Sequence, residues 1–370
     1  MNSNYRNLGM QTAWERFARE TDPRAGAREF ERRMRALEAG VASLNLTAEA
    51  VHLAAEIAAL EPKLDDDERI ALIVLVLVSL TALEEGSTRF PVAGPEAQEP
   101  MRRMLTPLCA DAFGSSGIAT MMHAIEDLLA SRKASSVIGT TPDEFKPLLY
   151  LAPFIYHQRV RAAETALAGK LANLLKSDDQ LADDGRIASM LTDVAQRPSM
   201  LQGKPLKLSG EQIAAVEIAA RAHLTVISGG PGTGKTSIVL AIVRLLVRLG
   251  IEPGEIALTA PTGKAAYRIG ESIRDGLAQL TDRAPSDREL ANNSPLPTTI
   301  HRLLGYSPTL RRFRHHHNNP LAESVVIVDE GSMLDLHLVE RLLDAIRPGG
   351  RLIVLGDADQ LPSVAAGAVF

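Results

Sequence analysis

A glycine-rich segment between an apolar run and an amphipathic segment restricts the fold of this chain. Residues 229–236 read GGPGTGKT and match G-x-x-x-x-G-K-[ST], the P-loop pattern of phosphate-binding proteins. The apolar run Leu224–Ser228 precedes the loop, and the spacing of apolar residues over Ser237–Leu249 predicts an amphipathic helix after it. Glycines let backbone N–H groups converge on phosphate oxygens, and the helix N-terminus adds a favourable dipole. A strand–loop–helix unit of this kind is typical of an α/β fold.

Further apolar runs indicate that this unit belongs to a parallel sheet. The candidates for buried strands after Gly203 are Leu224–Ser228, Glu255–Thr259, Val325–Asp329 and Arg351–Leu355. Helical segments fill most of the gaps between them, and such alternation predicts a parallel sheet with helices on both faces. We therefore expect an α/β domain over residues 204–370.

The N-terminal part of the chain has a different pattern. Residues 1–140 are rich in Ala, Leu, Glu and Arg at helical spacing, which predicts a mostly helical domain. Residues 141–203 are expected to connect the two domains. Within this connection we predict a short strand at 148–151, a helix over 156–175 and a polar, loop-like stretch over 177–203, and we also expect a polar linker over 131–147.

Composition narrows the class of protein. The chain has 370 residues, of which 45% are apolar and 23% charged, as in soluble globular proteins of two or three domains. Its net charge of −5 gives no global basic signal, so any contact with DNA has to be local. The longest apolar run, residues 70–83, is shorter than the roughly 20 residues of a membrane helix, and the N-terminus around Trp14 lacks an export-signal pattern. With one cysteine, Cys109, and no zinc-ligand set, we expect a cytoplasmic protein.

Two motifs predict the chemistry of ATP and Mg²⁺. Lys235 is expected to reach the β and γ phosphates, and the Thr236 hydroxyl to bind Mg²⁺. The apolar run Val325–Val328 ends in Asp329 and Glu330, which is the Walker-B pattern at the end of a parallel strand. Asp329 is expected to hold the Mg²⁺ shell, and Glu330 to orient and deprotonate the attacking water. An exposed strand end would explain the acidic pair alone, but its place after a P-loop favours the catalytic interpretation.

Three further segments carry weaker signals. Residues 356–364 follow a predicted strand, where Gln360 is expected to sense the γ-phosphate, although an ordinary strand-to-helix loop has the same pattern. Segments 260–266 and 298–304 each open a helix, and His301 fits either a DNA contact or a capping position. For His315–His317 we favour an exposed loop over a metal site, because consecutive residues on a helix cannot all face one ion.

In this order the motifs resemble those of superfamily 1 helicases, and more closely those of the RecD family, the alpha subunits of exodeoxyribonuclease V. Similarity in the N-terminal half, over LYLAPFIYHQRVRAAETALA (149–168), is less specific. The resemblance implies a RecA-like motor domain behind a helical, partner-docking domain. The segments that carry it are GGPGTGKTS (229–237), APTGKAAYRI (260–269), TTIHRLLG (298–305), RRFRHHHNNPL (311–321), VVIVDEGSM (325–333) and LGDADQLPSVAAGAVF (355–370).

The resemblance also implies roles for individual residues. By it Gln212 would recognise adenine, and Thr262, Lys264, Thr299 and His301 would lie along a track for single-stranded DNA. Catalytic roles are expected for Lys235, Glu330 and Gln360. The predicted nucleotide-binding set is Gln212, Gly229, Gly230, Pro231, Gly232, Thr233, Gly234, Lys235, Thr236, Ser237 and Asp329, with Thr236 and Asp329 on Mg²⁺.

What the family does is expected of this chain by the same resemblance. That activity is 5′→3′ unwinding of DNA driven by ATP, on single-stranded DNA and duplex ends, with the beta and gamma subunits of exodeoxyribonuclease V, in double-strand break repair and recombination, and with no membrane partner. Family members continue into a second motor domain with arginine fingers, which implies that this chain is the N-terminal portion of a longer protein and has very low activity alone. Gly331 replaces the usual alanine, a small-for-small change that should be tolerated.

Two alternatives stay open at this point. One is a stand-alone superfamily 1B helicase without partner subunits, against which the helical N-terminal region weighs modestly. The other is a non-catalytic fragment that only binds nucleotide or a partner. Co-purification with two large subunits distinguishes the first alternative, and an ATPase assay with single-stranded DNA distinguishes the second.

Overall fold

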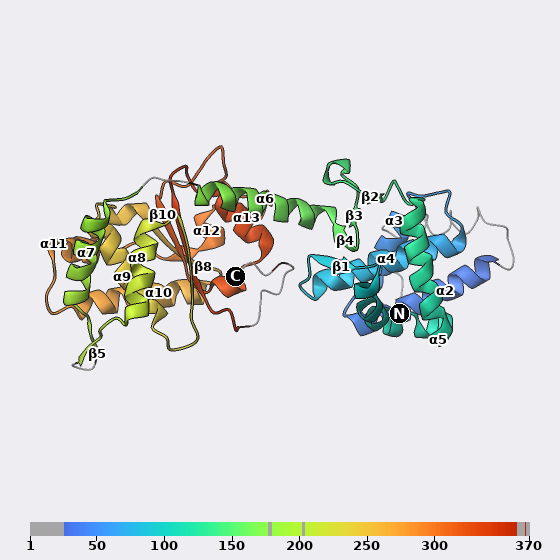
Figure 1. Ribbon diagram of the computed structural model, residues 1–370, viewed down its shortest axis with the longest axis horizontal. Helices are drawn as coiled ribbons and strands as arrows, with labels where there is room; N and C mark the ends of the chain where they lie inside the picture. Colours follow the sequence, from blue (N-terminus) through green and yellow to red (C-terminus); the bar gives the residue numbers. More distant parts are fainter. Residues whose placement is uncertain (1–25, 177–179, 202–203, 361–366, 368–370) are drawn as a thin grey trace. The chain divides into compact units, whose positions relative to one another are not determined.

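The chain forms two compact units, which divide between Ala162 and Ala163 inside helix α6 (Gln158–Leu175) (Figure 1). The computed structural model describes residues 26–176, 180–201, 204–360 and 367. In these residues no helix is both long enough and apolar enough to cross a membrane. The boundaries predicted near residues 140 and 203 stay predictions.

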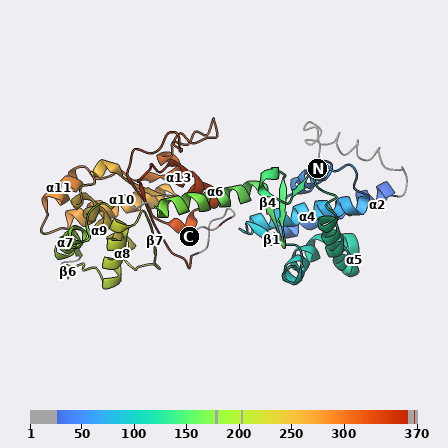
Figure 2. The ribbon, with the colours of Figure 1, turned by 45° about the horizontal axis from the view of Figure 1, so that its top comes forward.

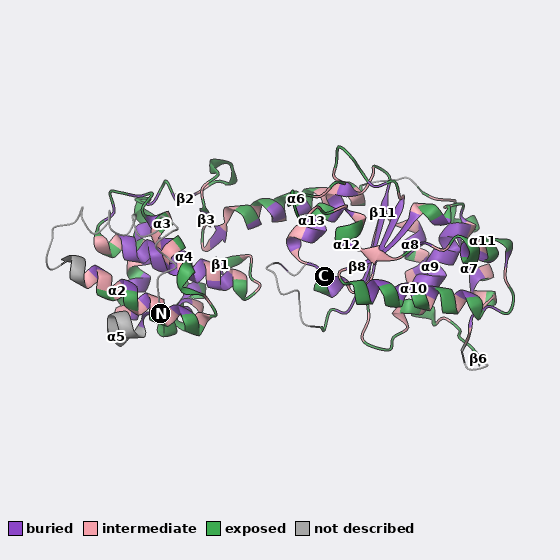
Figure 3. Cartoon of the chain, turned by 180° about the vertical axis from the view of Figure 1, so that it is seen from behind, coloured by how far each residue is buried: buried purple, intermediate pink, exposed green. Residues whose placement is uncertain are grey.

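The first unit is built around one helix whose central run is buried at every position. Its helices are α2 (Gly26–Gly40), α3 (Ala48–Ala58), α4 (Asp66–Glu84) and α5 (Gln98–Ser131). The run Ile70–Val78 of α4 is buried at every position, and α2, α3 and α5 pack around this core (Figure 3). The acidic start of α4 is a capping box, in which Asp65 Oδ1 accepts from Glu68 N at 2.8 Å and Glu68 Oε2 accepts from Asp65 N at 3.2 Å. Cys109 of α5 is also buried, and burial raises the pKa of its thiol to about 12.

A four-stranded sheet completes the described part of this unit. The strands are β1 (Arg89–Pro91), β2 (Ile138–Gly139), β3 (Leu148–Leu151) and β4 (Phe154–His157), in the order β1-β4-β3-β2. The predicted strand at 148–151 is confirmed. Two other predictions are wrong in detail. The helix expected from Tyr156 begins at Gln158 because Tyr156 and His157 pair in β4, and the expected linker 131–147 contains β2 and the fully buried Val137.

The second unit contains the predicted parallel sheet. Its strands are β7 (Leu224–Ser228), β8 (Ile256–Ala260), β9 (Thr298–Thr299), β10 (Val325–Val328) and β11 (Arg351–Gly356), in the order β7-β11-β10-β8-β9, and every pairing is parallel. Four of these strands were predicted to within one residue at each end. The sequence pattern missed β9, which has only two residues, both threonines.

Helices flank this sheet, as predicted, and α9 is their centre on one face. Helices α7, α8, α10 and α11 all pack against α9, and α9 lies between α8 and α10 (Figures 1 and 2). On the other side, Lys170 of α6 binds Glu340 and Asp344 of α13. The helices are α7 (Asp184–Gln196), α8 (Gly210–Arg221), α9 (Lys235–Arg248), α10 (Gly263–Ala278), α11 (Pro285–Asn292), α12 (Ile300–Leu303) and α13 (Leu336–Ala345).

Shorter elements connect these helices and strands. An antiparallel pair, β5 (Met200–Leu201) with β6 (Lys204–Pro205), precedes α8. Single 3-10 turns occupy Val41–Leu44, Pro95–Ala97, Pro142–Glu144, Pro253–Glu255 and Gly331–Met333.

The prediction of a loop over 177–203 is wrong, because α7 lies inside it. Its buried residues, Ile187, Leu191 and Val194, recur at i, i+4 and i+7 and belong to the same apolar core as α9. The many polar residues between them conceal this spacing. Asp183 caps the helix by accepting a hydrogen bond from Arg186 N at 2.9 Å.

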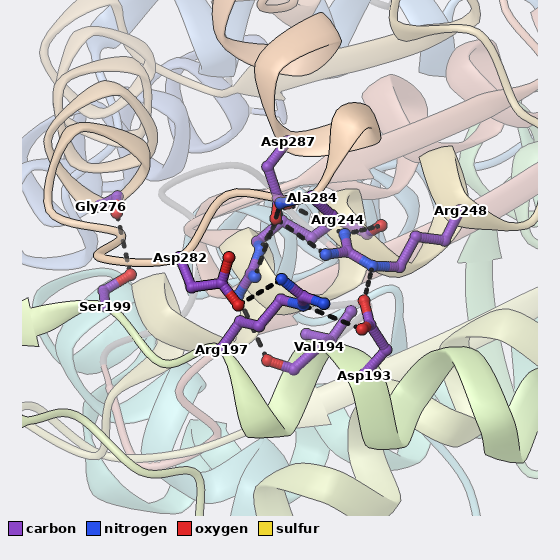
Figure 4. Close-up of polar contacts among 10 residues, drawn as sticks. All are labelled: Asp193, Val194, Arg197, Ser199, Arg244, Arg248, Gly276, Asp282, Ala284 and Asp287. Atoms are coloured by element: carbon purple, nitrogen blue, oxygen red, sulfur yellow. Dashed lines mark hydrogen bonds and ion pairs between the residues drawn. The ribbon is translucent and has the colours of Figure 1, made fainter.

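A buried network of ion pairs fixes the C-terminal end of α9 (Figure 4). Asp287 of α11 accepts from Arg244 at 2.9 and 3.3 Å and from Arg248 at 2.9 and 2.8 Å, and its side chain is 0% exposed. Arg248 also donates to Asp193 of α7 at 2.8 Å. At the edge of the network, Arg197 pairs with Asp193 and Asp282. Although burial alone raises the pKa of Asp287, the hydrogen bonds from the two arginines hold it well below its usual range.

Candidate nucleotide-binding site

The predicted phosphate loop joins β7 to α9, at the opposite end of α9 from the ion-pair network. Two of its glycines, Gly232 (φ +78°) and Gly234 (φ +82°), have left-handed backbone conformations that favour glycine. A Cβ atom at Gly234 would lie 2.7 Å from Gln212 Nε2. Gly229 N donates to Gly356 O at 3.1 Å, which ties the start of the loop to the end of β11. The helix predicted from Ser237 begins two residues earlier, at Lys235, so Lys235 and Thr236 lie in its first turn.

A cavity of about 440 Å³ brings most of the predicted nucleotide-site residues together. It lies where the phosphate loop, helix α10 and the ends of β10 and β11 meet. Gly229, Ser237 and Gln212 do not line it, but Gly229 and Ser237 flank the lining loop in sequence. The lining consists of Gly230, Pro231, Gly232, Thr233, Gly234, Lys235, Thr236, Ala265, Arg268, Ile269, Ser272, Asp329, Glu330 and Gln360.

Lys235 has no acidic partner in the ion pairs of the described chain. Its Nζ atom donates to the backbone oxygens of Gly229 and Gly230, the latter at 3.1 Å, and the side chain is half-buried. These acceptors are neutral carbonyl groups on an exposed loop. No acidic residue of the described chain therefore neutralises Lys235 in an ion pair, and its charge is available to a ligand in the cavity that it lines.

The two acidic residues predicted at the end of β10 both line the cavity. Asp329 N donates to Thr259 O at 2.9 Å, and Asp329 Oδ1 accepts from Glu330 N at 2.9 Å. Burial raises the pKa of Asp329, and the charge of Glu330 raises it further, while Lys235 and Arg268 oppose the shift. Glu330 has a φ of +57°, a strained conformation for a residue other than glycine, of the kind found at functional sites.

Gln360 reaches the same cavity from the end of β11. Its Nε2 atom donates to Asp357 Oδ2 at 3.1 Å, and Asp357 itself is 3% exposed. The other carboxylate oxygen of Asp357 accepts from Asp359 N at 3.1 Å. Asp357 therefore organises this turn, a role that the sequence pattern did not reveal. The rest of the third motif, residues 361–366 and 368–370, lies outside the described residues.

Gln212 lies beside the phosphate loop and not in the cavity lining. Its Nε2 atom donates to Thr233 O at 2.8 Å, and its Oε1 atom accepts from Ser209 N at 2.9 Å within the capping box of α8. One N–H and one lone pair of the amide remain for a further partner. Adenine recognition by Gln212 stays a prediction.

The four residues predicted to contact DNA lie at or just after the ends of two neighbouring strands. Thr262 caps α10 after β8, and Thr299, the last residue of β9, caps α12, with hydroxyl oxygens that accept from Ala265 N and Arg302 N at 3.2 and 3.3 Å. Lys264 and His301, in the first turns of these helices, are exposed. None of the four lines the cavity.

Sequence reasoning missed several residues near these sites. Arg268 and Ser272 of α10 line the nucleotide cavity, at the i+3 and i+7 positions from Ala265, but this spacing points to the cavity only once α10 is seen to pack beside the phosphate loop. Tyr306 and Phe313 surround the His301 ring, with centroid distances of 5.5 and 5.8 Å.

The histidine tract is a loop, as favoured from the sequence. His315 Nδ1 contacts backbone oxygens at 3.2 Å, and His317 Nδ1 lies 3.3 Å from Asp344. Over the described ranges, no group of three or more His, Cys, Asp or Glu residues could hold a metal ion.

Comparison with known proteins agrees with this geometry. A family model described as an AAA domain matches residues 212–366. The chain is 49% identical over 166 residues to the RecBCD enzyme subunit RecD of Mycobacterium tuberculosis, covering 43% of this chain and 28% of that protein. It is 42% identical over 160 residues to the RecD subunit of Haemophilus influenzae, covering 43% and 25%. To the ATP-dependent RecD2 DNA helicase of Deinococcus radiodurans it is 39% identical over 214 residues, covering 56% and 26%.

These matches establish the chain as a homologue of RecD helicases over part of its length. The predicted family resemblance and the α/β class with a P-loop are thereby confirmed. The match to an AAA domain and the similarity to P-loop helicases imply, in general terms, ATPase chemistry that uses ATP and Mg²⁺. The chain spans about a quarter of the length of the relatives it matches.

Proposed function

We propose that this chain provides the first motor domain of a RecD-type DNA helicase that translocates 5′→3′ on single-stranded DNA. The observation that carries the proposal is the cavity in which the phosphate loop meets Asp329, Glu330 and Gln360. In this proposal residues 204–370 form the RecA-like motor domain, residues 1–140 dock onto a partner, and residues 141–203 connect them.

The donors at the cavity suit Mg²⁺. Asp329 Oδ1 accepts a backbone hydrogen bond, which leaves Oδ2 for another partner, and Thr236 lines the same cavity. Carboxylate and hydroxyl oxygens are the ligands that Mg²⁺ prefers. The raised pKa of Asp329 means that the protein alone stabilises its ionised form poorly, a deficit that a cation would remedy. When bound, Mg²⁺ would neutralise charge on the β and γ phosphates.

The other residues at the cavity have separate roles in ATP hydrolysis. Lys235 exchanges its two carbonyl partners for phosphate oxygens, and Gly230–Gly234 offer backbone N–H groups. Glu330 orients the attacking water and accepts its proton, and Gln360 senses the γ-phosphate. Gln212 and Ser237 do not line the cavity, and in this proposal they bind the nucleotide from positions next to the phosphate loop.

The surface after β8 and β9 is proposed to contact single-stranded DNA. The residues involved lie at or just after the ends of adjacent parallel strands, namely Thr262, Lys264, Thr299 and His301. Tyr306, which is 38% exposed, stands next to the His301 ring, and exposed rings of this kind stack with bases regardless of sequence. ATP-driven steps along this surface would unwind duplex DNA from its ends.

We further propose that the chain works in a RecBCD-type exodeoxyribonuclease V complex, in the cytoplasm, in double-strand break repair and recombination. The similarity to RecD subunits supports this assignment. A second candidate is a stand-alone helicase, favoured by the 39% identity to the RecD2 helicase over 214 residues. A non-catalytic nucleotide-binding role is the third.

Three measurements separate these candidates. Tagged chain expressed in its own cells should co-purify with two large subunits if it is an exodeoxyribonuclease V component, and without them if it is a stand-alone helicase. The resulting preparation should unwind a duplex with a 5′ overhang and leave a 3′-overhang duplex paired. Unwinding of the 3′-overhang duplex alone would refute the direction. Absence of DNA-stimulated phosphate release from that preparation would support the non-catalytic role.

A further inference from the structure

Arg268 introduces a second cation into the nucleotide cavity, one that no phosphate-binding motif identified. It lies in the second turn of α10, and its neighbours Ala265 and Ile269 line the cavity with it and are themselves buried. This face of α10 is therefore fixed against the fold, while the Arg268 side chain is exposed. The backbone position of the arginine is thus set by packing, and its guanidinium group remains accessible to a ligand.

The cavity lining places Arg268 among the other charged residues of the site. Asp329 and Glu330 supply two negative charges to the lining, and Lys235 and Arg268 supply the two positive ones. Lys235 belongs to the phosphate loop side of the cavity, and Arg268 belongs to α10.

Arg268 has no carboxylate partner in the hydrogen bonds and ion pairs of the described residues. The contrast with Arg244 and Arg248 is direct, because those arginines share the buried carboxylate of Asp287. A guanidinium group that is positioned by its helix and left without an acid suits bidentate contact with phosphate.

We propose that Arg268 binds the γ-phosphate of the nucleotide and so makes this domain discriminate ATP from ADP. The inference rests on the proposed function, since it concerns the same site. The γ-phosphate lies next to the Walker-B carboxylates, between the lysine of the loop and the residue that orients water. Arg268 is the cavity residue of α10 that carries a positive charge to this position, whereas the β-phosphate is held by the loop.

The test compares binding of two nucleotides to the 370-residue chain. Mg²⁺–AMPPNP, a non-hydrolysable ATP analogue, and Mg²⁺–ADP are titrated into wild type, Arg268→Gln, Arg268→Lys and Arg274→Gln. Arg274 is the matched control, because it is an exposed arginine of the same helix outside the cavity lining.

We expect Arg268→Gln to weaken binding of Mg²⁺–AMPPNP by about tenfold or more, the scale of a charge-assisted hydrogen bond, and binding of Mg²⁺–ADP by less than about twofold. Arg268→Lys should fall between wild type and Arg268→Gln, and Arg274→Gln should match wild type. An equal loss for both nucleotides would assign Arg268 to the structure of the cavity and overturn the proposal. So would unchanged discrimination in Arg268→Gln. Failure of wild type to bind either nucleotide would instead contradict the proposed function itself, and the proposal with it.

Discussion

Helix α9 has basic residues at both ends, and the pKa values of the acidic residues near those two ends are shifted in opposite directions. At its C-terminal end, Asp287 receives four hydrogen bonds from two arginines, and its pKa is held low. At its N-terminal end, Asp329 lies near Lys235 and Arg268, yet its carboxylate accepts only a backbone hydrogen bond and its pKa is raised.

The two pKa values differ because the basic side chains donate hydrogen bonds to Asp287 but not to Asp329. At Asp287 the fold completes the charge pairing, so the network connects α7, α9 and α11 (Figure 4). At Asp329 the cations lie in a cavity and the pairing is incomplete. A partly buried acid that its own protein stabilises poorly, such as Asp329, is typical of a functional site, whereas an acid whose hydrogen-bond acceptors are all used, such as Asp287, is typical of a structural network. The two ends of α9 can therefore be tested against each other.

The largest effect is expected from Asp287→Asn. The change leaves Arg244 and Arg248 buried without their carboxylate, which should lower the free energy of unfolding by about 3–5 kcal/mol. Because the folded-state pKa lies below the unfolded value of about 3.9, this stabilisation is present above that pH and is lost as the pH falls through the folded pKa. Urea unfolding of wild type and variant at pH 7 measures the first effect, and a series from pH 7 down to about pH 2 follows the progressive loss on acidification. A variant as stable as wild type would mean that the network does not hold α9.

In the proposed full-length helicase, Lys235→Gln should abolish ATP turnover and leave the fold intact. Its amine bonds only loop carbonyls, so little packing is lost, while a missing phosphate donor costs about 10²- to 10³-fold in rate. Phosphate release with excess single-stranded DNA measures the rate, and the urea midpoint serves as the control for folding. Turnover near the wild-type rate would remove the P-loop from the mechanism.

Glu330→Gln should slow hydrolysis by about 10²-fold, the scale of a lost general base, with Mg²⁺–ATP binding nearly unchanged. Single-turnover hydrolysis and nucleotide titration separate the two quantities. If Glu330→Gln and Asp329→Asn behaved alike in both assays, the separate roles of the two acids would be wrong.

Asp329→Asn should have the opposite effect on stability to Asp287→Asn. Since the folded-state pKa of Asp329 is raised, its ionised form disfavours the fold at neutral pH, and that cost disappears as the pH falls. We expect the variant to unfold at a free energy within about 1 kcal/mol of wild type, and not below it. A loss comparable to that of Asp287→Asn would show that Asp329 is structural.

Arg197→Ala tests the edge of the network and should have the smallest effect. Arg197 pairs with Asp193 and with the largely exposed Asp282, so solvent weakens its contribution. A decrease of about 0.2–1 kcal/mol in the free energy of unfolding is expected by urea titration. A loss near that of Asp287→Asn would extend the rigid network to the surface.

The comparison also shows which features the sequence reveals. The P-loop, the Walker-B acids and four strands were predictable because their patterns are local: glycines before a lysine, or an apolar run before two carboxylates. Their meeting in one cavity follows from a parallel sheet, since strand ends of the same sense share an edge.

Arg268 and the Asp287 network were not predictable in this way. The place of Arg268 depends on how α10 packs beside the phosphate loop, and the pairing of Asp287 with Arg244 spans 43 residues of chain. Helix α7 was missed because its three buried positions stand among polar residues, and β9 because two threonines form no apolar run. Tertiary packing alone decides all of these features.

Calorimetric titration of Mg²⁺–AMPPNP into wild type and Asp329→Asn tests the central claim most directly, namely that the incompletely paired acid belongs to a nucleotide site. We predict one site per chain in wild type, dependence of its affinity on Mg²⁺, and clear weakening in Asp329→Asn even though that variant is no less stable. Equal affinity in the two proteins, or binding that persists unchanged when EDTA removes Mg²⁺, would contradict the account.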